Sequence, residues 1–201
     1  VAMLAAARIG AVFSFVFAGF GAGALAERIN DSKAVLLITA DGGFRNGKIV
    51  ELKKIADEAL EMTSTVRNVI VIKHAKNEIN MTEDRDIWYH EIVGDSHTYV
   101  EPEHMDANDP LFILYTSGTT GKPKGAVHST GGYSVWVTNT LKWAFDPDED
   151  DRWWCAADIG WITGHSYIVF APLMLGLTSI MYEGSITYPE PDRLWEIIEK
   201  Y

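Results

Sequence analysis

The chain has 201 residues, of which 47% are hydrophobic, and a formal net charge of −11 at pH 7. This length supports one sizeable core or two small ones, and the composition is typical of a globular protein rather than a disordered one. The acidic balance argues against a nucleic-acid partner and against an anionic membrane, because broad basic surfaces bind both.

The N-terminal segment is apolar, with Arg8 as the single charge among the first 26 residues. Ala22-Gly23-Ala24 resembles a signal-peptide cleavage site, so a secretory signal is one interpretation. The absence of a basic leader and the interrupting glycines favour the other, a buried helix-strand-helix rather than a signal or a membrane span.

Short apolar runs alternate with longer amphipathic segments along the chain, which predicts an α/β fold with a predominantly parallel sheet flanked by helices. Predicted strands are Ala11–Phe17, Ala34–Thr39, Asn68–Ile72, Leu111–Tyr115, Arg152–Ala157 and Thr178–Tyr182. Predicted helices are Gly23–Ile29, Lys48–Glu61, Ser129–Phe145, Gly164–Leu175 and Pro191–Tyr201. The polar stretch His74–Asp109 is expected to be a surface excursion, with a brief helix-like segment at Asp84–Val93.

The single cysteine, Cys155, excludes an internal disulfide and fits a reducing, cytoplasmic location. Its place in a predicted strand indicates a packed thiol rather than a nucleophile. The six histidines are scattered without helical ligand spacing, so the sequence indicates no protein metal site.

The run from Tyr115 to Gly125, Tyr-Thr-Ser-Gly-Thr-Thr-Gly-Lys-Pro-Lys-Gly, follows a predicted buried strand and contains no carboxylate. Its hydroxyls, glycines and lysines are suited to holding phosphate. The glycine and lysine spacing matches neither a Walker A loop nor a dinucleotide-binding fingerprint. The alternative is a flexible hydroxyl-rich surface loop.

At these residues the chain resembles the adenylate-forming enzymes, which include acyl-coenzyme A synthetases, peptide-synthetase adenylation domains and firefly luciferase. The resemblance implies attack of a carboxylate on the α-phosphate of ATP, with magnesium accompanying the nucleotide. It also implies that the loop wraps the β and γ phosphates and that a lysine offsets the charge of the leaving pyrophosphate. The phosphate-binding residues would be Thr116, Ser117, Gly118, Thr119, Thr120, Gly121, Lys122 and Lys124.

The block Trp154–Tyr167 resembles acetyl-coenzyme A synthetases and their short-chain relatives. The resemblance implies that Trp161, Ile162 and Thr163 line the acyl pocket, with Thr163 also near coenzyme A. Bulky rigid walls suit a small pocket but distinguish a single methylene only weakly. Core packing is the alternative for Trp161, as is expected for Trp153 and Trp154. His165 is expected to be structural or pocket-lining, because a carboxylate nucleophile is already ionised and needs no general base.

A third patch of resemblance, Thr39–Lys48, implies that Arg45, Asn46, Gly47 and Lys48 contact coenzyme A, with Arg45 and Lys48 on its phosphates. A solvated turn with two ordinary cations is the alternative. The segment Glu183–Pro189 departs from the family, because Thr187 stands where relatives often carry an asparagine that contacts coenzyme A.

The resemblance covers nearly the whole chain, yet family motifs for adenine, ribose, magnesium and the C-terminal lysine have no counterpart in it. We therefore expect residues 1–201 to be a partial N-terminal domain of a synthetase for acetate or a similar short acid, inactive alone, with the remainder of that domain and the C-terminal domain absent. One alternative is a non-catalytic remnant or split-gene product that binds nucleotide phosphates, self-associates or pairs with a complementary polypeptide. A kinase-like phosphate-binding domain ranks last, because it gives the Trp-Ile-Thr block no role.

Overall fold

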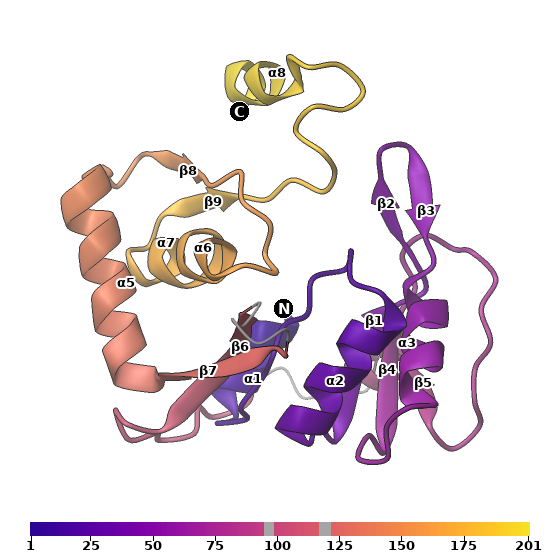
Figure 1. Cartoon of the computed structure of the whole chain (residues 1–201). Coiled ribbons are helices and arrows are strands. Elements are labelled where there is room, and N and C mark those ends of the chain that lie inside the picture. Colours follow the sequence, from indigo (N-terminus) through magenta and orange to yellow (C-terminus); the bar gives the residue numbers. More distant parts are fainter. Residues whose placement is uncertain (95–98, 117–121) are drawn as a thin grey trace.

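The computed structural model describes residues 1–94, 99–116 and 122–201, and Figure 1 shows two groups of elements with a C-terminal helix apart from both. One group contains α1 (Ala2–Arg8), β6 (Pro110–Thr116), β7 (Lys124–Ser129), α5 (Thr130–Phe145), β8 (Arg152–Trp154), α6 (Ile162–Gly164), the π-helix η1 (His165–Phe170), α7 (Ala171–Met174) and β9 (Thr178–Ile180). The other contains α2 (Ala22–Ser32), β1 (Leu36–Ala40), β2 (Gly43–Arg45), β3 (Lys48–Val50), α3 (Leu52–Leu60), β4 (Asn68–Ile72), β5 (Asp86–Trp88) and α4 (Tyr89–Val93). The helix apart is α8 (Arg193–Lys200).

The second group is built on a parallel sheet of order β1-β4-β5. Val69 and Val71 of β4 are fully buried, and so is Ala59 of the neighbouring helix α3. Small residues on α3 allow close packing, and the two valines suit a strand covered by a helix.

A buried ion-pair network joins α3 to β5. Lys53 is fully buried, and its Nζ lies 2.7 Å from the Asp57 carboxylate and 2.9 Å from that of Asp86. Arg85 contacts the same two carboxylates at 2.7 and 2.6 Å. The network gives the buried ammonium and the buried Asp86 carboxylate the partners that they need away from water.

The first group packs around the β6–β7 hairpin, α5 and η1. Its buried cluster comprises Met3, Leu111, Phe112, Leu114, Tyr133, Val137, Leu141, Ile168, Val169, Phe170, Ala171 and Leu177. Cys155 and Trp153 pack against this cluster, as predicted, whereas Trp154 is half-buried outside it. The indole N–H of Trp153 donates to the Tyr167 carbonyl at 2.6 Å, so the polar atom of this half-buried ring is satisfied.

The predicted α/β class is confirmed, and the pairs β1/β4, β4/β5 and β8/β9 are parallel. The described strands nevertheless form four small sheets, two of which are antiparallel hairpins. No helix within the described residues is long and apolar enough to cross a membrane.

The prediction of a strand at Ala11–Phe17 is wrong. Within it, Phe13 makes one bridge to Phe112, and its carbonyl accepts the Ile113 N–H at 2.9 Å. The run is apolar because Phe13 and Phe15 pack against the core, and its pairing with β6 is limited to this single bridge. Burial by side-chain packing and burial within a sheet leave the same hydrophobic signal in a sequence.

The predicted helix Lys48–Glu61 begins too early, because Lys48–Val50 is strand β3, paired with β2. Asn46 and Gly47, with φ of 49° and 71°, form the connecting turn, a conformation that favours Asn-Gly in hairpins. The polar stretch after His74 also contains β5, which joins the parallel sheet; its brief apolar core, Ile87-Trp88, was too short to indicate a strand.

Candidate functional site

The predicted phosphate-binding run connects two antiparallel strands rather than a strand and a helix. Thr116 at the end of β6 pairs with Lys124 at the start of β7, and both residues are exposed, as is Lys122. The predicted residues Ser117, Gly118, Thr119, Thr120 and Gly121 lie outside the described part of the chain. The hairpin therefore presents a hydroxyl and an ammonium on paired strands at one end.

The Tyr115 ring packs against Gly125, one residue pair before the Thr116–Lys124 end of the hairpin. Tyr115 pairs with Gly125, where an added Cβ would come within 2.9 Å of Ile113 and 3.2 Å of the Tyr115 ring. The Tyr115 hydroxyl donates to Asp31 of α2 at 2.6 Å. Burial, followed by the bond to Asp31, raises the pKa of Tyr115 to about 12, so the hydroxyl stays a donor at neutral pH.

Trp161, Ile162 and Thr163 are all exposed at the N-terminal end of α6. Trp161 is 53% exposed, which contradicts core packing for this ring. The turn before α6 is held by Asp158, whose carbonyl accepts the Trp161 N–H at 3.2 Å. An added Cβ at Gly164 would overlap that same carbonyl and lie 2.6 Å from the Ile159 Cα, so this turn requires glycine.

His165 is fully buried directly behind these residues. Its Nδ1 lies 3.1 Å from the Trp161 carbonyl, which can only accept, so the bond places the proton on Nδ1. Burial lowers the pKa of His165, and the neutral ring packs among phenylalanines, with the Phe112 ring tilted against it at 5.0 Å and the Phe13 ring stacked at 6.2 Å. Of the two expected roles, structural or pocket-lining, this burial favours the structural one, because a ring this enclosed supports the turn from inside.

The predicted coenzyme A residues Arg45, Asn46, Gly47 and Lys48 lie together on the exposed β2–β3 hairpin. Tyr188 packs so closely over Gly47 that its hydroxyl occupies the place of a Cβ. Thr187, which stands where relatives often carry an asparagine, forms a hydrogen bond with the Ser185 hydroxyl at 3.0 Å.

The hairpin is also bound at its base. Glu183 lies 2.8 Å from the Nε2 of His74 and accepts the Phe44 N–H at 3.4 Å. Through these contacts and that of Tyr188 with Gly47, the segment that enters α8 braces the hairpin.

Buried Asp41 anchors the start of the same hairpin. Its Oδ1 accepts the N–H groups of Gly42, His74 and Ala75 at 2.7 to 2.8 Å, and its Oδ2 accepts that of Lys76 at 2.8 Å. Burial raises the pKa of Asp41, but the four donors outweigh it and hold the pKa below its ordinary value. Asp41 lies within the Thr39–Lys48 patch, where the resemblance assigned it no role.

Phe17, which sequence reasoning did not assign to the site, brings two of the predicted sets together. Its ring lies 6.0 Å from the Trp161 ring and 5.4 Å from the Arg45 guanidinium carbon. The signal that could have found it is the Phe-Ala-Gly-Phe sequence, since a strand seldom continues through Gly19 and Gly21. The linker between α1 and α2 thus joins the predicted acyl pocket to the predicted coenzyme A hairpin.

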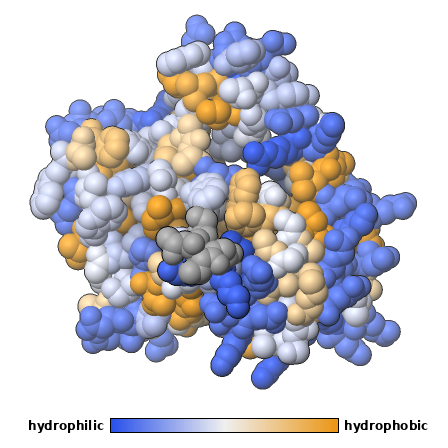
Figure 2. Space-filling view, viewed as in Figure 1, coloured by the Kyte–Doolittle hydropathy of each residue, from blue (hydrophilic) through white to orange (hydrophobic). Residues whose placement is uncertain are grey.

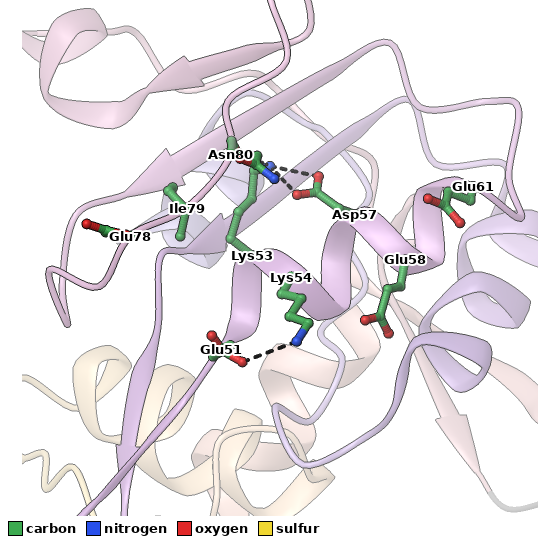
Figure 3. A pocket seen from close by; sticks show the side chains of 9 residues that line it. All are labelled: Glu51, Lys53, Lys54, Asp57, Glu58, Glu61, Glu78, Ile79 and Asn80. Atoms are coloured by element: carbon green, nitrogen blue, oxygen red, sulfur yellow. Dashed lines mark hydrogen bonds and ion pairs between the residues drawn. The ribbon is translucent and has the colours of Figure 1, made fainter.

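A cavity of about 540 Å³ lies along α3 and contains none of these predicted residues (Figure 3). Five carboxylates line it, those of Glu51, Asp57, Glu58, Glu61 and Glu78, against the two lysines Lys53 and Lys54. Figure 3 shows both lysines paired, Lys53 with Asp57 and Lys54 with Glu51. This excess of negative charge is unsuited to nucleotide phosphates.

Magnesium has no protein cage in this part of the molecule. No group of three or more His, Cys, Asp or Glu side chains that could hold a metal ion occurs among the described residues. Magnesium commonly binds through substrate phosphates with few protein ligands.

Comparison with known proteins places the chain. Residues 1–201 match the AMP-binding enzyme family over their whole length. Acetyl-coenzyme A synthetases of Pyrobaculum arsenaticum and Bdellovibrio bacteriovorus are 55% and 54% identical to this chain over its full length. The matched region covers 30% and 31% of those two proteins. The acetoacetyl-CoA synthetase structure from Streptomyces lividans matches with a TM-score of 0.89 and 30% identity, over 99% of this chain and 30% of that one.

The chain thus spans about 30% of the length of the relatives that it matches. The resemblance inferred from the Tyr115–Gly125 and Trp154–Tyr167 motifs is confirmed by these matches. The chain belongs to the family of AMP-binding enzymes.

Proposed function

We propose that this chain is part of an AMP-forming acyl-coenzyme A synthetase that activates acetate or a similar short acid with ATP and transfers the acyl group to coenzyme A. The observation that carries the proposal is identity of 50 to 55% over the whole chain to proteins named acetyl-coenzyme A synthetase. At such identity the motif residues and their spacing are expected to serve the same chemistry.

The proposed roles follow the three residue sets. Thr116, Lys122 and Lys124, with residues 117–121, would hold the ATP phosphates, and an ammonium there would stabilise charge that develops on pyrophosphate. Trp161, Ile162 and Thr163 would border the acyl group. Supporting this role, their exposure leaves them available to a ligand.

Residues 45–48 would contact coenzyme A. The contact of Phe17 with both Arg45 and Trp161 supports a path between the acyl pocket and this hairpin. Magnesium would enter with ATP and screen the phosphates when bound.

The test is acetate-dependent exchange of labelled pyrophosphate into ATP by the full-length polypeptide that carries these residues. Replacing Lys122 and Lys124 by alanine is expected to lower kcat by about 100-fold or more, whereas Lys54→Ala, which removes an exposed lysine on α3, is expected to leave it unchanged. Exchange that does not depend on a carboxylic acid would refute the proposal.

We also propose that residues 1–201 are a partial N-terminal domain whose apolar faces are covered by further parts of such a synthetase. By strand alternation, Leu36 and Ile38 share a face of the parallel sheet with Ile72 and Ile87, and all four are exposed. On α5, Trp136 and Trp143 are 60% and 76% exposed. Figure 2 shows several separate groups of apolar residues on one face, with hydrophilic residues around most of its rim.

Such faces predict that the 201 residues alone self-associate or bind a complementary polypeptide. We expect them to be inactive alone, because the family motifs for adenine, ribose and the C-terminal lysine have no counterpart in them. Sedimentation of the isolated chain tests this. A monodisperse monomer that catalyses exchange would contradict it.

A further inference from the structure

A row of aromatic rings and guanidinium groups runs between the three predicted residue sets. The Phe17 ring lies 5.7 Å from that of Phe20, over which the Arg28 guanidinium carbon lies at 4.5 Å. The same guanidinium carbon lies 5.7 Å from the centre of the Tyr115 ring. Contacts therefore continue from the linker beside Trp161 and Arg45 to the residue before Thr116.

Arg28 is the central member of this row. It belongs to α2, is 8% exposed, and donates from Nη1 to the Ala24 carbonyl at 2.6 Å, which fixes the side chain along its own helix. A guanidinium plane between two rings is attracted to both faces, and lysine does not reproduce the planar geometry. Arg28 thus holds the Phe20 and Tyr115 rings at a set separation.

The Tyr115 ring is fixed from two further directions. Asp31, one turn beyond Arg28 on α2, accepts its hydroxyl at 2.6 Å, and Gly125 leaves the space against which the ring packs. Because Tyr115 pairs with Gly125 and Thr116 pairs with Lys124, the position of this ring sets the position of the hairpin end.

We propose that Arg28 and Asp31 are positioning residues that hold the Thr116–Lys124 end of the hairpin, through Tyr115, in register with the linker that contacts Trp161. They act on the reaction through Tyr115 and do not contact substrate. The inference deepens the proposed function and rests on it for its catalytic consequence. Its structural part, that residues of α2 position the β6–β7 hairpin, does not depend on the proposed function.

The test uses the full-length polypeptide with two single variants and their combination. Tyr115→Phe removes the Asp31 bond and keeps the ring, whereas Arg28→Met removes the cation and keeps much of the apolar stem. We expect each to raise the KM for ATP by about fivefold, with the KM for acetate changed less than twofold. Arg28→Lys should restore only part of the loss, and the matched control Arg67→Met, an exposed arginine, should have no effect.

Because both changes act on one ring, the double variant should fall short of the product of the single effects. Hydrogen exchange supplies a readout that needs no activity: the amides of residues 124–127 should exchange several-fold faster in both single variants, with those of α5 unchanged. If the parent catalyses no acetate-dependent exchange, the proposed function fails while hydrogen exchange still tests the positioning. Unchanged hydrogen-exchange rates at the amides of residues 124–127, or an equal rise in these rates throughout the chain, would overturn the inference.

Discussion

The replacement Asp41→Asn is expected to destabilise the protein far more than its near-identical size suggests. An asparagine oxygen can keep the bonds from Gly42, His74 and Ala75, but its NH₂ group would then face the Lys76 N–H, donor against donor. Asp41 is 1% exposed, so water cannot reach the new NH₂ group to accept its hydrogen bonds.

The magnitude follows from the kinds of bond involved. Three charge-assisted bonds become neutral ones, and one buried donor is left unsatisfied, for a total of about 2 to 4 kcal/mol. For a chain of this size each kcal/mol lowers Tm by roughly 2 to 4 °C. The exposed Asp150→Asn makes the same change of charge and is expected to shift stability by less than about 0.5 kcal/mol.

Urea unfolding at several pH values checks the reasoning. Because four N–H donors hold the pKa of Asp41 below its ordinary value of 3.8, its stabilisation is present above that pH and is lost as pH falls through the lower, folded-state value. The stability gap between parent and Asp41→Asn should therefore shrink as the pH falls below 3.8. A gap under about 0.5 kcal/mol at neutral pH, or one that widens in acid, would refute the account.

Three further predictions concern other parts of the fold. The cationic partners of Asp86 outweigh its burial and lower its pKa from 3.8 to about 2, so about 2 kcal/mol of stability should be lost between roughly pH 5 and pH 2, and acid titration of Asp86→Asn should lack that loss. Gly164→Ala should cost about 2 kcal/mol or more in urea unfolding, because its Cβ would overlap the Asp158 carbonyl, whereas Gly23→Ala in open space on α2 should be neutral or stabilising. Arg45→Gln should raise the KM for coenzyme A about tenfold in acyl-transfer assays and leave pyrophosphate exchange unaffected; an equal loss in both reactions would contradict its proposed role.

The hydrophobic pattern predicted those strands and helices in which one continuous run of apolar residues packs into the core. Asn68–Ile72 is β4 to the residue, and Ser129–Phe145 differs from α5 by one position. The pattern failed at Ala11–Phe17, where aromatic side chains enter the core without forming a strand. It also failed at Lys48–Val50, where an Asn-Gly turn signalled a hairpin that the following helix obscured.

Motif resemblance located candidate residues in sequence but not the contacts between them. Phe17, Arg28 and Asp31 lie outside the quoted motifs, and their contacts with Trp161, Arg45 and Tyr115 join residues far apart in the chain. Such contacts depend on how α2 and the linker pack, which periodicity does not specify. The antiparallel pairing of β6 with β7 was likewise hidden, because β7 has an exposed, Gly-containing sequence.

The central claim is that these residues serve acyl-adenylate formation from a short carboxylic acid. The most direct measurement is exchange of labelled pyrophosphate into ATP by the full-length polypeptide, with acetate, with octanoate and with no acid. The account predicts rapid exchange with acetate and only background with octanoate or no acid. Equal exchange in all three conditions, or exchange supported by octanoate alone, would contradict it.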